Sequence, residues 1–348
     1  MRVAVIGGGV VGLSTTLGLV GLGADVTCYE RGDPMGERSA GETRIFRLAH
    51  AYPDMVDLAA RARRAFTGWS ERAGVPMIED VGTVVSGAGT DEWVAAMAAA
   101  GAGHEVVEAG SPLLRLPTDR FAGPALVDPA GGVIRVDRVT AFLTAAVGNR
   151  VRRAHVYGIE ETGDRVTVSA DGGPEHVDAV VLCAGAGTSP LAATAGIYTP
   201  PALEHHVRFS FPVRPGAPGP LQCWITKDEP STYQHTSQHT PHPGTWTVGA
   251  QVAGPAVAWE AGPEAAERAS REVVTDYVAR HLPAIEPRVV GRLYCTHNPD
   301  LGDGFRFVRR GRVLAVYGEN LFKFAPLLGT MIARAVADGT TPTEAGDR

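Results

Sequence analysis

The sequence is poor in lysine and in cysteine, and both shortages are informative. Of the 32 basic residues, only Lys227 and Lys323 are lysines. The 4 cysteines lie far apart and form no closely spaced pair, which argues against a disulfide framework and a zinc ribbon. We therefore expect a protein of a reducing compartment, with a cytoplasmic location.

Excess positive charge and long apolar runs are also missing. The chain has 32 basic and 38 acidic residues, a formal net charge of −6 with histidine neutral. This balance argues against nucleic acid or an anionic membrane as a partner. The uncharged stretch 3–24 contains seven glycines, so a buried strand and a packed helix explain it better than a signal peptide or membrane span.

A histidine-rich segment at 233–242 contains His235, His239 and His242. Zinc binds an HxxxH pair when a helix places both rings on one face, but Thr, Ser and Pro interrupt any helix here, and the run contains no carboxylate. We predict no metal site. One of these histidines is a candidate for substrate recognition or acid–base chemistry, and the sequence does not say which.

The N-terminal stretch RVAVIGGGVVGLSTT contains Gly7-x-Gly9-x-x-Gly12, and Glu30 follows Gly12 by 18 residues. The first glycine permits a tight turn, the second lets backbone approach a pyrophosphate, and the third lets the helix pack on the sheet. The helix N-terminus favours phosphate, and Glu30 is placed to accept hydrogen bonds from a ribose. The motif predicts a bound dinucleotide without distinguishing NAD from FAD.

The apolar patterns predict how the rest of the chain is organised. Helices are expected over 10–22, 54–73 with Asp54 as N-cap, 91–100, 138–147, 264–281 and 327–337, and strands over 3–6, 25–29, 151–170, 177–183 and 313–317. The nucleotide-binding elements are widely separated, and turn-rich β patterns lie between them. This indicates one nucleotide-binding domain built from several segments, with a second domain inserted.

Four motifs resemble the FAD-dependent D-amino-acid-oxidase superfamily, most closely monomeric sarcosine oxidase and N-methyltryptophan oxidase. They are ERGDPMGERSAGETRIFRLAH after the second strand, GGVIRVDRVTAFL at 131–143, VVLCAGAGTSPL at 180–191 and GENLFKFAPLLG at 318–329. The resemblance covers most of the chain, is strong at both ends, and is weak from about 205 to 290.

The resemblance implies an α/β fold, α+β overall. A Rossmann-type FAD-binding domain would be built from the discontinuous segments 1–78, 138–203 and 298–340. The inserted substrate-binding domain, a mostly antiparallel sheet, would comprise 79–137 and 204–297, leaving a polar tail at 341–348.

The resemblance also implies roles for individual residues. Arg44 would lie against the flavin ring, and Arg47 and Lys323 would clamp the substrate carboxylate. A slim ammonium between Phe322 and Phe324 fits where a planar guanidinium would collide, and the last helix, starting near Pro326, would point its N-terminus at the flavin. The full set of implied FAD-binding residues is Gly7, Gly9, Gly12, Glu30, Arg31, Ser39, Thr43, Arg44, Val156, Ala184, Gly185, Gly318, Leu321, Phe322 and Lys323.

The sequence departs from the family pattern at two positions. Aligning Pro299 and Asp300 places Leu293 where sarcosine oxidases carry the cysteine that bonds the flavin, with Cys295 two residues later, so we expect non-covalent FAD. Thr247 occupies the position of the lysine that activates oxygen. Either another cation activates oxygen, or the enzyme reacts slowly with oxygen and is a dehydrogenase.

These features predict an FAD-dependent oxidase acting on the C–N bond of an amino acid or of an N-alkylated or cyclic amino acid. Hydride transfer to flavin N5 would give an imine, and molecular oxygen would reoxidise the flavin to yield hydrogen peroxide. The alternatives are a dehydrogenase with a quinone or protein acceptor, a biosynthetic enzyme oxidising a larger carboxylate-bearing amine, and a non-catalytic flavoprotein. A nicotinamide-only dehydrogenase leaves the C-terminal motif unexplained.

Overall fold

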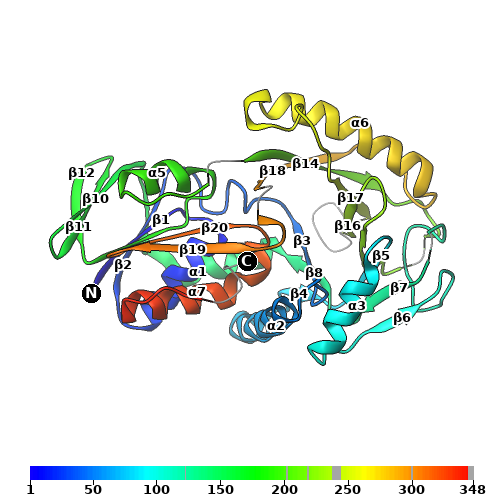
Figure 1. The fold of residues 1–348 in the computed structure, drawn as a ribbon, viewed down its shortest axis with the longest axis horizontal. Coiled ribbons are helices and arrows are strands. Elements are labelled where there is room, and N and C mark those ends of the chain that lie inside the picture. Colours follow the sequence, from blue (N-terminus) through cyan, green and yellow to red (C-terminus); the bar gives the residue numbers. More distant parts are fainter. Residues whose placement is uncertain (122, 201–202, 218, 237–243, 299–300, 344–348) are drawn as a thin grey trace. The chain divides into compact units, whose positions relative to one another are not determined.

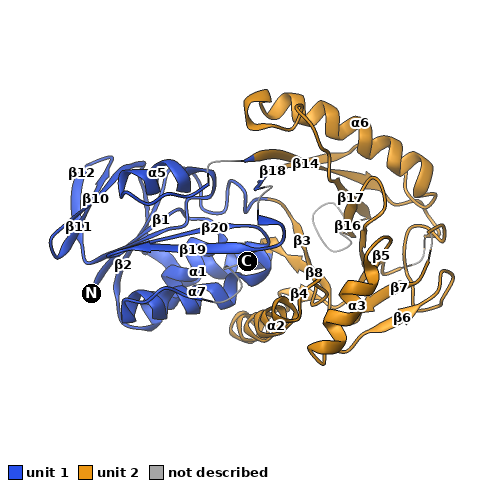
Figure 2. Cartoon of the chain, viewed as in Figure 1, with its two compact units in different colours: residues 1–40, 138–203, 296–348 blue, residues 41–137, 204–295 orange. Residues whose placement is uncertain are grey.

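The computed structural model describes the chain except residues 122, 201–202, 218, 237–243, 299–300 and 344–348, and it contains two compact units (Figure 2). Unit 1 comprises 1–40, 138–203 and 296–348, and unit 2 comprises 41–137 and 204–295. Residues 41–78, expected in the first domain, pack within unit 2. The assignment of a cofactor role and a substrate role to the two domains stays a prediction.

Unit 1 is built on a six-stranded sheet in the order β19-β20-β13-β1-β2-β9 (Figure 1). All neighbouring pairs are parallel except the antiparallel pair β19–β20. The central strands are continuous apolar runs, which is typical of strands buried on both faces. Their bounds are β1 Arg2–Ile6, β2 Asp25–Glu30, β9 Val151–Arg153, β13 Ala179–Leu182, β19 Phe305–Arg310 and β20 Val313–Gly318.

Two helices of unit 1, α1 (Val10–Gly21) and α7 (Leu321–Asp338), pack closely against each other. A Cβ at Gly18 would lie 2.6 Å from the carbonyl oxygen of Gly329, and one at Gly329 would lie 2.6 Å from the carbonyl carbon of Ser14. The two glycines therefore allow a backbone approach that side chains would prevent.

The remaining elements of unit 1 include a second, smaller sheet that packs on the same core. An antiparallel sheet of three strands runs in the order β10-β11-β12, and its apolar residues join those of β1 and β13 in one buried cluster. The elements are α4 Val136–Val147, whose first two residues belong to unit 2, η1 Gly148–Arg150, β10 Val156–Thr162, β11 Arg165–Ala170, β12 Gly173–Val177, η2 Gly185–Gly187 and α5 Thr188–Thr194.

Unit 2 contains an eight-stranded sheet in the order β18-β14-β17-β16-β15-β5-β7-β6 and a three-stranded sheet in the order β3-β8-β4. The printed pairings are antiparallel except β15–β5. The bounds are β3 Thr43–Phe46, α2 Pro53–Ala73, β4 Ile78–Glu79, β5 Thr83–Ser86, α3 Thr90–Ala99, β6 Glu105–Val107, β7 Ala125–Asp128, β8 Gly132–Arg135, β14 Glu204–Pro212, β15 Cys223–Thr226, β16 Thr232–Thr236, β17 Thr245–Ala250, η3 Trp259–Ala261, α6 Pro263–His281 and β18 Gly291–His297, which ends in unit 1.

Helix α6 covers one face of the eight-stranded sheet (Figure 1). Val207, Phe209 and Phe211 alternate along β14 and share a buried cluster with Val274 and Val278 of α6. Alternation sends the residues between them to the opposite face. Unit 2 therefore has one apolar sheet face under α6 and a second face that is free to carry polar groups.

These features confirm the α/β fold class and correct two predicted helix starts. Helix α2 begins at Pro53 with Tyr52 as N-cap, so Asp54 lies inside the first turn. Helix α7 begins at Leu321, and Pro326 lies inside it rather than at its start. Pro326 is the sixth residue of the helix, beyond the first turn, so this proline does not mark the first residue.

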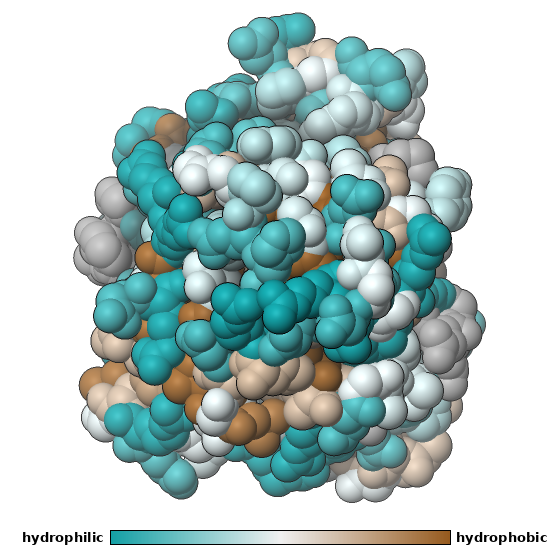
Figure 3. All heavy atoms as spheres, turned by 90° about the vertical axis from the view of Figure 1, so that its left-hand side faces the viewer, coloured by the Kyte–Doolittle hydropathy of each residue, from teal (hydrophilic) through white to brown (hydrophobic). Residues whose placement is uncertain are grey.

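Hydrophilic side chains cover most of the face drawn in Figure 3, with apolar side chains in smaller groups between them. Among the described helices, none is both long and apolar enough to cross a membrane.

Candidate cofactor and substrate site

The turn between β1 and α1 needs two of its glycines for steric reasons. Gly7 has a φ of +106°, and a Cβ there would lie 2.9 Å from the Cα of Ala184. A Cβ at Gly12 would overlap the carbonyl oxygen of Gly7. The turn therefore lies tightly against the end of β13, and the helix packs directly on the turn.

Gly9 is different, because the fold itself does not require a glycine there. It is the N-cap of α1 with φ −74° and ψ −178°, and its Cβ would meet only the Oγ of Ser39, at 3.1 Å. Ser39 Oγ accepts a hydrogen bond of 3.0 Å from the N–H of Val10. The first turn of α1 contains no acidic residue, so the positive end of its dipole is available to an anion.

Glu30 ends β2 beside this turn. Its carboxylate accepts hydrogen bonds from the N–H of Gly8 (2.7 Å) and the N–H of Gly32 (2.8 Å). These bonds fix the carboxylate at the carboxyl edge of the sheet while leaving oxygen lone pairs for further donors. Arg31 forms an exposed ion pair with Glu37 at 2.7 Å.

The other predicted residues of unit 1 fall at the same sheet edge or close to it. Ala184 follows β13, Gly185 has a φ of +55°, and Gly318 ends β20 with a φ of +138°. The chain leaves β1 toward β2 on one side, while β13 and β20 lie on the other, so the strand order reverses at this point. Ligands of open α/β sheets bind at such a switch point. Val156 is buried at the start of β10.

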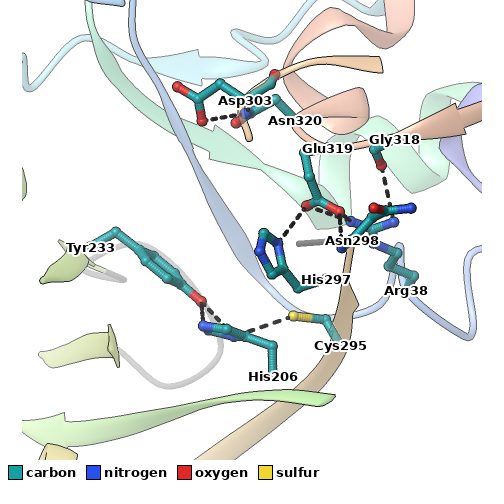
Figure 4. A network of polar contacts seen from close by, with 10 residues as sticks. All are labelled: Arg38, His206, Tyr233, Cys295, His297, Asn298, Asp303, Gly318, Glu319 and Asn320. Carbon is teal, nitrogen blue, oxygen red and sulfur yellow. Dashed lines mark hydrogen bonds and ion pairs between the residues drawn. The ribbon is translucent and has the colours of Figure 1, made fainter. Parts of the chain in front are cut away.

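The start of α7 is held by a polar cluster that the sequence did not reveal (Figure 4). Both carboxylate oxygens of Glu319 accept hydrogen bonds from Arg38 Nη2 at 2.7 Å, and Arg38 Nη1 donates to the carbonyl of Gly318 at 3.1 Å. Burial raises the pKa of Glu319, but His297, Arg38 and the N–H of Asn298 outweigh it and leave the pKa below its ordinary value. The carboxylate is therefore ionised and pins the turn.

Asn320, the N-cap of α7, continues this arrangement. Its φ is +55°, and its side chain donates to the carbonyl oxygen (3.1 Å) and to the carboxylate (2.8 Å) of Asp303. Leu321 and Phe322, half-buried, and Lys323, only 3 % exposed, make up the first turn. Lys323 Nζ lies 5.0 Å from the ring centroid of Phe324.

Unit 2 carries Thr43 and Arg44 on β3, where they pair with Arg135 and Ile134 of β8. Arg44 Nη1 donates to the carbonyl of Thr43 at 2.8 Å, and the buried Thr43 hydroxyl lies 3.1 Å from Nδ1 of His235. Burial lowers the pKa of His235 to about 3, with the nearby charges of Arg208 and Arg44 acting in the same direction.

Arg47 is buried in a cationic and aromatic cluster of unit 2. Its guanidinium carbon lies 4.7 Å from the centroid of the Trp93 ring, and Lys227 Nζ lies 5.3 Å from the same ring. Arg47 Nη1 donates to the carbonyl of Ala49, whose N–H donates to the buried Asp128. Burial raises the pKa of Asp128, while its backbone hydrogen bonds and the charge of Arg47 act against this rise.

A chain of polar contacts joins three further side chains of unit 2 (Figure 4). The hydroxyl of Tyr233 lies 2.8 Å from Nδ1 and 3.0 Å from Nε2 of His206, and Nδ1 lies 3.6 Å from Sγ of Cys295. Thr247 is buried, and its hydroxyl lies 2.8 Å from that of Ser210.

No metal cluster of three His, Cys, Asp or Glu side chains is found in the described part of the chain. His239 and His242 of the histidine-rich segment, where no metal site is predicted, lie outside the described residues. Lys323 and Arg44 belong to different units, as do Lys323 and Arg47.

Comparison with known proteins assigns the chain to a class. The family model for FAD dependent oxidoreductases, DAO, matches residues 2–335. The chain belongs to this family, and FAD is its cofactor. A comparison with curated proteins gave no match.

Solved structures of similar fold include several oxidoreductases. NikD, an unusual amino acid oxidase essential for nikkomycin biosynthesis, has a TM-score of 0.80 at 20 % identity, over 98 % of this chain and 95 % of NikD. Glycine oxidase from Geobacillus kaustophilus has a TM-score of 0.77 at 18 % identity, over 99 % and 96 %. L-proline dehydrogenase from P. horikoshii has a TM-score of 0.77 at 17 % identity, over 99 % and 94 %.

The residues of unit 1 fit this cofactor. The turn leaves space at Gly9 that a Cβ would fill, the N-terminus of α1 favours a pyrophosphate, and Glu30 is a fixed acceptor for ribose hydroxyls. FAD, when bound, supplies the acceptor for two electrons from the substrate.

Proposed function

We propose that the chain is an FAD-dependent oxidase of the C–N bond of an amino acid, including N-alkylated or cyclic ones. The amine form of the substrate loses two electrons and two protons and becomes an imine, which water hydrolyses. Molecular oxygen takes up both electrons and protons and is released as hydrogen peroxide. The names of the similar structures, which include amino acid oxidases, support this class of substrate.

The position of Lys323 carries the proposal. A cation in the first turn of a helix is disfavoured by the helix dipole, and burial disfavours it further. Lys323 is nevertheless 3 % exposed in the first turn of α7. A carboxylate on the substrate would offset both effects, and we propose that Lys323 contacts it.

We assign the same anionic partner to Arg47, a buried cation of unit 2. Its planar guanidinium is suited to bidentate contact with a carboxylate, whereas the ammonium of Lys323 acts as a point charge. The further residues predicted to touch FAD are proposed in the same roles. They are those of the glycine turn, Glu30, Ala184, Gly185 and Gly318 at the carboxyl edge of the sheet, Thr43 and Arg44 toward the ring, and Arg31, Ser39, Val156, Leu321 and Phe322.

The test is anaerobic titration of the purified yellow protein with a panel of amino acids. At least one should bleach the visible flavin absorbance, and admitting air should restore it with one hydrogen peroxide per substrate. In Lys323→Met and Arg47→Ala, carboxylate ligands should bind at least ~10-fold more weakly while FAD stays bound. Unchanged ligand affinity in both variants would remove the amino-acid assignment.

A dehydrogenase is the second candidate, and Thr247 favours it. In the resemblance this position belongs to the lysine that activates oxygen, whereas here a buried threonine hydroxyl lies 2.8 Å from Ser210. Without a cation at this position, charge that develops on oxygen loses electrostatic support. Substrate reduction at a normal rate followed by reoxidation in air over many minutes would select the dehydrogenase.

A further inference from the structure

The polar face of the eight-stranded sheet in unit 2 contains a buried arginine. Along β14, Phe209 and its alternate neighbours pack under α6, and His206, Arg208 and Ser210 point to the opposite face. Arg208 is 6 % exposed. The side chain is therefore buried rather than exposed to solvent.

A row of three residues across the sheet shapes the surroundings of Arg208. Arg208 of β14 and Tyr233 of β16 both pair with Gly249 of β17. A Cβ at Gly249 would overlap the Tyr233 ring, and the guanidinium carbon of Arg208 lies 5.7 Å from the centroid of that ring. The glycine thus lets the tyrosine lie toward the arginine, and His206 holds its hydroxyl.

Arg208 has no acidic partner in the described part of the chain, and its buried Nε has no hydrogen-bond acceptor there. Another buried arginine of unit 2, by contrast, has two acidic partners. Arg135 pairs with Glu79 at 2.8 Å and with Asp137 at 2.7 Å. Burying an unpaired guanidinium is strongly unfavourable, so a missing anion is the simplest explanation of Arg208.

His235 on the same face gives a second, independent indication. The residue is 2 % exposed, Nδ1 lies 3.1 Å from the Thr43 hydroxyl, and Nε2 has no hydrogen-bond partner among the described residues. Burial and the charges of Arg208 and Arg44 lower its pKa to about 3, so the ring is neutral. When Thr43 donates to Nδ1, Nε2 carries the hydrogen and is a second buried donor.

We propose that Arg208 and His235 bind an acidic group of the substrate, and that the substrates are amino acids with a second carboxylate in addition to the one assigned to Arg47 and Lys323. This inference rests on the proposed function and narrows its substrate class. A carboxylate matches both observations, because it accepts bidentate hydrogen bonds from a guanidinium and one more from a neutral imidazole.

The experiment compares propionate and succinate as ligands of the FAD-loaded protein, followed by changes in the flavin spectrum. Succinate should bind at least ~10-fold more tightly than propionate, since a charge-assisted hydrogen bond contributes about that factor. In Arg208→Met this advantage should disappear while propionate binds as before. The melting temperature without ligand should stay the same or rise, because an apolar side chain replaces a buried unpaired charge.

Arg271→Met is the matched control. Arg271 belongs to α6, pairs with Glu267 at 2.9 Å, and lies 4.8 Å from the ring of Phe209, on the opposite face of the same strand. This variant loses the same charge from the helix that packs on the same strand, and it should keep the full preference for succinate. A general effect of net charge would lower the preference equally in both variants and would overturn the assignment.

Three other results would also overturn it: equal affinity of the wild type for propionate and succinate, an equal loss of both ligands in Arg208→Met, or release of FAD from that variant. Ligand titration requires no turnover, so failure of the second-carboxylate assignment can be distinguished from failure of the proposed function. If no amino acid bleaches the flavin, the oxidase assignment fails whatever succinate does. If amino acids bleach it and succinate shows no preference, only the second-carboxylate assignment fails.

Discussion

Replacing Gly9 with alanine should separate FAD binding from folding. The backbone of Gly9 is extended, with φ −74° and ψ −178°, which any residue adopts. The nearest atom to its Cβ would be Ser39 Oγ at 3.1 Å, the end of a short side chain that can move by a few tenths of an ångström. By contrast, a Cβ at Gly12 would overlap the backbone of Gly7.

The two effects of Gly9→Ala differ in size. Alanine restricts the unfolded chain and thereby stabilises the fold by ~0.4–1 kcal/mol. The slight crowding of Ser39 acts in the opposite direction. The free energy of unfolding of the apoprotein should therefore change by less than ~1 kcal/mol. The new methyl group occupies space assigned to the pyrophosphate. Losing one hydrogen bond to a charged group there costs ~1.5–3 kcal/mol, about 10–150-fold in the dissociation constant of FAD.

The assay pairs urea unfolding of the apoprotein with titration of FAD, followed by quenching of flavin fluorescence. Gly21→Ala is the control, because Gly21 ends the same helix and its Cβ would meet no described atom within 4 Å. A folded Gly9→Ala protein that binds FAD as tightly as the control would refute the placement of the phosphates at this turn.

Three further results are expected. Gly329→Ala should lower the free energy of unfolding, measured in urea, by ~1–3 kcal/mol, because α1 and α7 must separate. The control Gly68→Ala, in open space on α2, should raise it by ~0.5–1 kcal/mol, and equal effects would contradict the close helix contact. His235 has a folded-state pKa of about 3, below its unfolded value, so the unfolded chain binds the extra proton below pH ~6.5. The melting temperature should therefore fall as pH drops toward 3, and His235→Gln should flatten that fall. Glu319→Gln removes a carboxylate with a lowered pKa, so its destabilisation, measured by melting temperature, should be largest near neutral pH and shrink in acid; a constant difference would exclude the ion pair with Arg38 as the cause.

The phosphate-binding turn between β1 and α1 was predictable because its parts are close in sequence. Gly7, Gly9 and Gly12 lie in one turn and helix, and the apolar strand before them defines the edge on which they stand. By contrast, Glu319 and Arg38 are 281 residues apart, and no local pattern joins them. Such pairs become visible only when the strands that carry them are placed in one sheet.

The start of α7 shows a second limit of sequence patterns. The resemblance places the start of this helix near Pro326, yet the helix already includes the fully buried Phe324 and Ala325 before it. Arg208 shows a third limit of sequence patterns. The alternation of HHVRFSF indicates a strand, but whether a buried arginine has an acidic partner depends on neighbouring strands from elsewhere in the chain.

The packing of α1 on α7 has a consequence for biosynthesis. Within unit 1, the range 138–203 contributes β13, which pairs with β1, and the range 296–348 contributes β20 and α7. The ribosome therefore synthesises β20 and α7 after all of unit 2. Until then α7 does not cover the apolar side of α1, and chaperones are expected to bind this exposed surface. Pairings between such remote segments form slowly, so acquisition of the yellow colour by a newly made chain should lag well behind completion of its synthesis.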